Sequence, residues 1–250
     1  MEIHRVTPAI RTIRVLLHIA YGLALGCVFP AFSGARQLKI MQRWSQSLLS
    51  ILNVQLRVQA QHGLQHTEGQ LLLANHISWL DVFVINACTP ARFVAKSDVA
   101  AWPLIGWMVR RSGTLFIRRE HRRDTSRANQ MVTQCLRGGE RVAVFPQGTS
   151  TDGTEPVHFH SAMVQTAIDA QCMVQPLRIR YVNDAGRALT EVAFTGDMTF
   201  AASLWNILCL PRFTVIVTYL PLLDCVGANR REIAGAAQTA VNAADAKQAA

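Results

Sequence analysis

The hydrophobic pattern divides the chain into an apolar amino-terminal part and a longer part in which short apolar runs alternate with amphipathic segments. Strands are predicted where apolar and polar residues alternate or where four or five apolar residues follow one another, at 54–59, 71–74, 92–95, 113–117, 141–145, 174–181 and 213–219. Helices are predicted between them, at 82–87, 124–137 and 160–170. Strands separated by helices indicate an α/β domain with a central, mostly parallel or mixed sheet flanked by helices.

The amino-terminal part predicts a membrane-associated helical hairpin. Residues 13–32 are long enough to cross a bilayer, although Arg14 and His18 shorten the clean span. The same residues could instead dip into the membrane surface, with Pro30 ending the helix, and both readings stay open. A cleaved signal peptide is disfavoured, because no small-x-small site follows before Arg36. Residues 36–53 form a second, basic amphipathic helix that suits either an interface or packing on the domain.

These patterns predict three regions. The amino-terminal helices occupy 1–53 and the α/β domain occupies 54–225. The Ala-rich tail at 226–250 is either a short helix or a frayed terminus.

The charge of the chain adds information about its partners that the hydrophobic pattern does not give. Half of the 250 residues are apolar and 16% are charged, yet the formal net charge is +9, and all but three of the 25 basic residues are arginine. Disordered, collagen-like and polytopic transporter chains are excluded by the apolar content, the low Gly and Pro counts and the few long apolar segments. An arginine-rich apolar chain suits an anionic surface: a membrane, a nucleic acid or a phosphorylated substrate. The six cysteines form no CxxC pair, which argues against zinc ribbons and predicts buried free thiols.

The first candidate site follows the apolar run 71–74 and reads Asn75-His76-Ile77-Ser78-Trp79-Leu80-Asp81. Ligands of α/β folds collect beyond the carboxyl ends of strands, where this segment is expected. A loop can fold His76 back onto the Asp81 carboxylate, which would fix the imidazole tautomer and stabilise the imidazolium. The structural alternative is a capping box, with Ser78 as N-cap and Asp81 three residues later.

Two further candidates also come at strand ends. Residues 113–119 deliver Arg118 after a strand, and guanidinium groups bind phosphate bidentately. Phe145-Pro146-Gln147-Gly148-Thr149-Ser150 offers hydroxyls and a glycine that permits close approach, although Pro-x-Gly is also common turn chemistry. For Arg122, Arg123 and Arg127, we prefer a solvated helix start.

In their order and spacing, Asn-His-x-Ser-x-x-Asp, Gly-x-x-Phe-Ile-x-Arg, Phe-Pro-x-Gly-Thr and Val-x-Pro resemble the glycerolipid acyltransferase family, whose best-known members are lysophosphatidic acid acyltransferases. The resemblance covers about residues 36–221. It implies transfer of a fatty acyl group from acyl-CoA or acyl-carrier protein to a lysolipid hydroxyl, with 1-acylglycerol-3-phosphate as the leading acceptor. It also implies His76 as general base, Asp81 as its orienting carboxylate and Arg118 as a phosphate ligand. The remaining predicted substrate contacts are Asn75, Ser78, Gln147, Gly148 and Thr149.

Two departures from the family pattern bear on the acceptor. Gln147 stands where Glu is usual, and Ser150 stands where Arg often follows. The continuation Ser-Thr-Asp-Gly resembles a bacterial subgroup that includes lyso-ornithine lipid acyltransferases, so that acceptor is the alternative. A non-catalytic lipid-binding scaffold on the same fold is an alternative of another class.

The expected mechanism is direct transfer, because the sequence lacks a Gly-x-Ser-x-Gly elbow; Ser78 as nucleophile is a minor alternative. No metal or cofactor is expected, apart from the acyl donor as substrate. The expected partners are the bilayer, the lysolipid and the acyl carrier, at the cytoplasmic side of a bacterial inner membrane. Nucleic acid is not expected, because aromatic and basic residues do not interleave.

Overall fold

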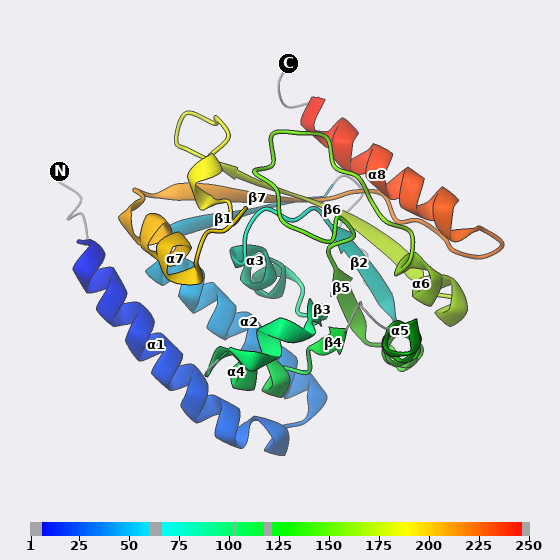
Figure 1. Ribbon diagram of the computed structural model, residues 1–250, viewed down its shortest axis with the longest axis horizontal. Coiled ribbons are helices and arrows are strands. Elements are labelled where there is room, and N and C mark those ends of the chain that lie inside the picture. The colour runs from blue at the N-terminus through cyan, green and yellow to red at the C-terminus, as the bar shows by residue number, and fades with distance from the viewer. Residues whose placement is uncertain (1–6, 61–66, 103, 118–121, 247–250) are drawn as a thin grey trace.

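The computed structural model describes residues 7–60, 67–102, 104–117 and 122–246, and these form a mixed sheet of seven strands flanked by helices (Figure 1). The strands are β1 (Val54–Ala60), β2 (Gln70–Ala74), β3 (Arg92–Lys96), β4 (Leu115–Ile117), β5 (Arg141–Val144), β6 (Met173–Val182) and β7 (Phe213–Tyr219). The α-helices are α1 (Pro8–Val28), α2 (Gly34–Ile51), α3 (Leu80–Cys88), α4 (Ile105–Arg111), α5 (Arg122–Arg137), α6 (Val164–Ala170), α7 (Phe200–Cys209) and α8 (Arg230–Ala246). The α/β prediction is therefore confirmed.

The strand order is β1-β7-β6-β2-β5-β3-β4. Among the seven strands that the structure describes, only β6 and β7 pair antiparallel with each other. Strands β6, β2, β5, β3 and β4 therefore run in one direction, and β1 and β7 run in the other. The carboxyl ends of β2, β4, β5 and β6 consequently meet at one edge of the sheet. This edge is where ligands collect in parallel sheets.

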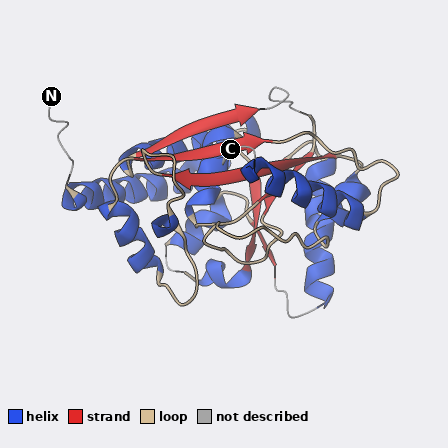
Figure 2. Cartoon of the chain, turned by 90° about the horizontal axis from the view of Figure 1, so that it is seen from above, coloured by secondary structure: helices blue, strands red, loops and turns tan. Residues whose placement is uncertain are grey.

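Helices lie on both sides of the sheet (Figure 2), and an apolar core fills the space on each side. Strand β2 shows why a continuous apolar run is needed, because Leu72 packs with α2, α3 and α7 while Leu71 and Leu73 pack with α5, α6 and α8. Successive side chains of a strand point to opposite faces, so a strand buried on both faces needs apolar residues throughout. The same burial fixes the place of the loop that follows Ala74.

Helix α1 lies against the domain through one face and exposes the other. Its buried positions include Arg11, His18 and Gly22, and it contacts α2, α4 and α7. The buried Arg11 guanidinium donates to the carbonyls of Leu208 (3.1 Å) and Leu210 (2.5 Å) at the carboxyl end of α7. A cation there is favoured by the unpaired carbonyls and the helix dipole. The exposed face is apolar and includes Ile10, Ile13, Leu16, Leu17, Tyr21 and Val28.

Several predicted boundaries were wrong. Helix α1 begins at Pro8 and its α-helical part ends at Val28, because Pro30 lies in a 3-10 turn over Phe29–Ala31. Helix α6 begins only at Val164, and β4 spans three residues after Gly113, whose φ is +78°. Helices α4 and α7 were not predicted.

The structure decides between the alternatives for the carboxyl-terminal tail and corrects part of the expectation for the cysteines. Of the two alternatives for the tail, the structure has the helix, and α8 packs into the sheet's second core. Cys172 and Cys225 are buried free thiols, as expected, but Cys27 and Cys209 are exposed, so burial was wrong for these two.

Candidate active site

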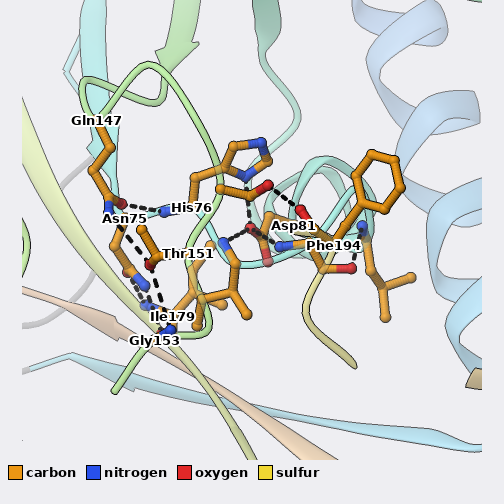
Figure 3. Close-up of polar contacts among 12 residues, drawn as sticks. Asn75, His76, Asp81, Gln147, Thr151, Gly153, Ile179 and Phe194 are labelled. Carbon is orange, nitrogen blue, oxygen red and sulfur yellow. Dashed lines mark hydrogen bonds and ion pairs between the residues drawn. The ribbon is translucent and has the colours of Figure 1, made fainter. Parts of the chain in front are cut away.

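The candidate site is built from loops that leave β2 and β5 at the common carboxyl edge of the sheet. Asn75 and His76 follow β2 directly, and Phe145 to Thr149 follow β5. These two strands are hydrogen-bonded neighbours, with Leu73 opposite Val144. The first and third sequence motifs therefore come together, as the strand-end argument predicted (Figure 3).

His76 and Asp81 form the central pair of the site. His76 Nδ1 lies 2.8 Å from Asp81 Oδ2, and the carboxylate is fully buried while the imidazole side chain is 21% exposed. Since an ionised carboxylate can only accept, Nδ1 carries the proton and donates it to this bond. In the neutral imidazole, Nε2 then holds the lone pair. The pair thus presents a base, supported by a buried carboxylate, at a partly exposed position.

The Asp81 carboxylate is held from several sides. Besides the imidazole, Oδ2 accepts the backbone N–H groups of Ile77 (2.7 Å) and Ser78 (2.9 Å), and Oδ1 accepts the hydroxyl of Tyr181 (2.6 Å). These bonds compensate for removing the charge from water, which a buried carboxylate requires. Both interpretations of Asp81 hold together, because the same oxygen orients His76 and satisfies amides before α3.

Half of the predicted capping box is present, because Asp81 accepts the Ser78 N–H, but the half made by the Ser78 hydroxyl was predicted wrongly. Helix α3 begins at Leu80 with Trp79 as the residue before it, so Ser78 precedes the N-cap position by one residue. The Ser78 hydroxyl accepts from the N–H of Leu80 at 3.4 Å instead of capping the N–H of Asp81, which donates to the Ser78 carbonyl.

Aromatic rings fix the plane of the imidazole. The His76 ring stacks on Phe145, with centroids 4.0 Å apart and planes 11° from parallel. Phe145 in turn stacks on Phe93 from β3, at 6.0 Å between centroids. The imidazole is therefore confined by the Asp81 bond at one edge and by an aromatic face on one side.

The loop after β5 holds the main chain of His76. Gln147 Oε1 accepts the His76 N–H at 2.7 Å, and the N–H of Thr151 donates to the His76 carbonyl at 3.0 Å. The Gln147 amide also reaches the Thr151 hydroxyl, at 3.5 Å. Gln147 therefore acts through its carbonyl oxygen, which a Glu would also offer. The neutral side chain at this position is compatible with the geometry of the site.

The remaining predicted contacts differ in accessibility. Gly148 is half-buried in a turn with φ +80°, and Thr149 is exposed, so both remain open to a substrate. Asn75 and Ser78 are buried, at 1% and 0% exposure, which does not fit the predicted contact with substrate. The Asn75 amide instead exchanges two hydrogen bonds with the backbone of Ile179, at 3.0 and 2.7 Å. Arg118 lies outside the described residues, and so does Arg119, on which the last position of the Gly-x-x-Phe-Ile-x-Arg motif falls when it is counted from Gly113.

Other arginines of the basic stretch have local roles. Arg110 donates to the carbonyl of Ala100 at 2.6 Å, and Arg111 lies over the Trp107 ring, 5.3 Å from its centroid. Arg127 is exposed on α5, as the solvated-helix interpretation predicts.

The sequence analysis did not single out three residues that contact this segment, Thr151, Tyr181 and Phe194. The Phe194 N–H donates to the Ile77 carbonyl at 2.9 Å, and the Ser150 hydroxyl donates to the Phe194 carbonyl. A polar aromatic residue at the end of a predicted buried strand was the one available signal for Tyr181.

Comparison with known proteins places this arrangement in a family. A family model described as Acyltransferase matches residues 55–180, which include the His76–Asp81 pair and the loop after β5. A lyso-ornithine lipid O-acyltransferase from Pseudomonas aeruginosa is 33% identical over 96% of this chain and 94% of its own. The chain belongs to the acyltransferase family. A 1-acyl-sn-glycerol-3-phosphate acyltransferase from Neisseria meningitidis serogroup B is 32% identical over 74% of this chain and 72% of its own.

The fold is also that of a solved acyltransferase. The crystal structure of the 1-acyl-sn-glycerophosphate (LPA) acyltransferase PlsC from Thermotoga maritima superposes with a TM-score of 0.66. The match covers 96% of this acyltransferase and 98% of the other chain at 19% identity, so it establishes a common fold. It includes the amino-terminal helices as well as the sheet.

Proposed function

We propose that this acyltransferase moves a fatty acyl group from acyl-CoA or acyl-carrier protein to the hydroxyl of a lysolipid. The observation that carries the proposal is the His76–Asp81 pair, in which Nδ1–H is bound to the carboxylate and Nε2 holds the lone pair. Nε2 takes the proton of the acceptor hydroxyl as its oxygen attacks the thioester carbonyl. Collapse of the tetrahedral intermediate breaks the C–S bond, and the thiolate leaves with that proton. Donor and acceptor supply every atom, so the reaction needs no cofactor or metal.

The leading acceptor is 1-acylglycerol-3-phosphate, giving phosphatidate. Relatives named for this acceptor and the phosphate role implied for Arg118 support it. Lyso-ornithine lipid is the second candidate. It is favoured by the neutral Gln147, by Ser150 in place of an arginine, and by the match of a lyso-ornithine lipid enzyme along nearly the whole chain.

We further propose that the protein lies on the cytoplasmic side of a bacterial inner membrane, with α1 dipping into the surface. Pro8–Ala31 is long and apolar enough to cross a membrane, as no other described helix is. However, one face of α1 packs on the domain, which favours the dipping alternative over a separate span. The exposed Arg14, Arg36 and Lys39 suit anionic lipid headgroups.

The decisive experiment compares the wild type with His76→Ala in purified membranes, using a labelled acyl thioester and each lysolipid in turn. We expect the substitution to lower kcat by about 10²- to 10⁴-fold, the range for loss of a general base. His158→Ala removes an exposed histidine and serves as the matched control, with activity unchanged.

Each outcome separates the alternatives. Turnover that depends on His76 eliminates the scaffold, and the preferred lysolipid identifies the acceptor. Full activity of His76→Ala would overturn the assignment of the base.

A further inference from the structure

Strand β6 extends beyond the strand beside it, and this extension reaches the active site. Strand β2 ends at Ala74, opposite Leu177, whereas β6 continues for five more residues to Val182. The Asn75 amide holds Ile179 through both its backbone N–H and its carbonyl. Tyr181, two residues further on, points to the same face of the strand as Ile179. The extension therefore carries Tyr181 alongside the segment that holds His76 and Asp81.

The Tyr181 hydroxyl donates to Asp81 Oδ1 at 2.6 Å, on the carboxylate oxygen opposite the one bound to His76. Its side chain is buried at 3% exposure, beside Phe213. Burial, followed by the charge of Asp81, raises the pKa of Tyr181 well above its usual value, so the phenol stays protonated. Tyr181 is thus a permanent donor to the carboxylate that supports the base.

Resting on the proposed role of His76 as general base, we propose that Tyr181 is a positioning residue that sets, through Asp81, how strongly His76 holds a proton. A hydrogen bond to Oδ1 draws charge away from the carboxylate and lowers its power to stabilise the imidazolium. The bond also fixes the rotation of the carboxylate, because Oδ2 must face both Nδ1 and the amides of Ile77 and Ser78. Tyr181 therefore keeps His76 aligned while limiting its basicity.

Among the described groups around Asp81 and His76, Tyr181 is the one that can tune how strongly His76 holds its proton. Among the described residues, the titratable groups bonded to Asp81 are His76 from its own segment and Tyr181 from β6. Phe145 from β5 and Gln147 from the following loop contact His76 without bringing charge. Arg178 and Arg180, on β6, point to the face opposite Tyr181.

The test measures how kcat/KM depends on pH in Tyr181→Phe. The acid limb of this profile shows the pH at which the base of the free enzyme becomes protonated. Without the donor, Asp81 stabilises the imidazolium more strongly, so we expect the acid limb to move up by roughly half a pH unit. We also expect kcat to fall about 3- to 10-fold, with the KM for the lysolipid unchanged, because the carboxylate loses alignment and not the substrate site.

Two matched variants separate this role from a purely structural one. Tyr219→Phe removes another buried phenol bond, the one between Tyr219 and the Thr89 hydroxyl at 2.5 Å, and should leave the profile in place. 3-Fluorotyrosine placed at position 181 keeps the contact but is a stronger donor, so it should move the acid limb to lower pH. Opposite shifts from the two changes at 181 cannot come from damage to folding.

The experiment distinguishes failure of the Tyr181 proposal from failure of the proposed acyl transfer. If wild type is active, His76→Ala is inactive and neither change at 181 moves the acid limb, then Tyr181 has only a structural role. If the chain lacks acyl transfer, the effect can still be measured by NMR. The measured quantity is then the pH at which the chemical shift of the His76 Cε1–H resonance is halfway through its change. A midpoint that is the same in wild type and Tyr181→Phe would then overturn it.

Discussion

At the scale of single residues, the site depends on how the main chain of His76 is held. Its N–H is bound by the Gln147 side chain and its carbonyl by the N–H of Thr151. The side chain is confined separately, by Asp81 and by the Phe145 ring. A carbonyl oxygen at position 147 is therefore sufficient for this geometry, and a charge there is not required.

This leads to a prediction for Gln147. Gln147→Leu removes the acceptor and leaves the His76 N–H unpaired, which costs about 1–3 kcal/mol for a buried donor. We also expect kcat to fall roughly 10- to 100-fold, because the His76 imidazole loses its alignment when its main chain is no longer held. Gln147→Glu keeps an oxygen at the same place and should stay within about threefold of wild type. Acyl transfer assays on both variants check this, and wild-type activity in Gln147→Leu would contradict it.

At the scale of elements, two glycines of α1 allow this helix to pack closely against side chains of α4. A Cβ added to Gly22 would lie 2.7 Å from Met108 Cε, and one added to Gly26 would lie 2.5 Å from Trp107 Cζ3. These approaches are too short for any side chain, so the two glycines let the helices pack closely. The Arg11 bonds to the end of α7 hold the other end of α1. Helix α1 is therefore integrated into the domain.

The packing of α1 predicts a contrast between two Gly→Ala changes. Both Gly26→Ala and Gly235→Ala gain helix propensity, about 0.5–1 kcal/mol. Only Gly26→Ala forces a carbon against an indole ring, whereas a Cβ at Gly235 meets nothing within 4 Å. Overpacking costs about 1–3 kcal/mol, so Gly26→Ala should be less stable than Gly235→Ala by that amount. Denaturant unfolding in micelles measures the difference, and equal stabilities would show that α1 packs loosely.

At the scale of the whole molecule, the exposed apolar side chains are unevenly distributed. Helix α1 contributes six of them, including Leu16 at 61% and Leu17 at 65% exposure, on the face turned away from the domain. The opposite face of the sheet is covered by α5, α6 and α8 (Figure 1). An apolar helix face of this size, flanked by basic residues, suits insertion into a bilayer surface.

Leu17→Asp should therefore weaken binding to vesicles of phosphatidylethanolamine and phosphatidylglycerol by roughly 10-fold or more, since burying a leucine contributes about 1.5–3 kcal/mol. Met131→Asp changes an exposed apolar residue on α5 and is the matched control, with binding unchanged. Co-sedimentation measures both. Equal binding of Leu17→Asp and wild type would remove α1 as the membrane contact.

The sequence by itself determined the order of most elements and the position of the site. Alternation and continuous apolar runs predict strands because burial on one or both faces requires these patterns. The motif residues directly follow such runs, and parallel strands bring their ends together, so His76 and Gln147 could be expected at one place. Helices α4 and α7 were missed because short apolar segments show little periodicity.

Tertiary structure alone decided how the His76–Asp81 pair is supported. Tyr181 lies 100 residues beyond Asp81, and Ile179 lies 104 residues beyond Asn75. These contacts depend on β6 pairing with β2 and extending past it, which no local pattern specifies. The burial of Ser78 likewise follows from packing around Asp81. Local periodicity shows which face of a helix or strand is buried. The hydrogen-bond partner of each polar group is determined only when these elements pack against one another.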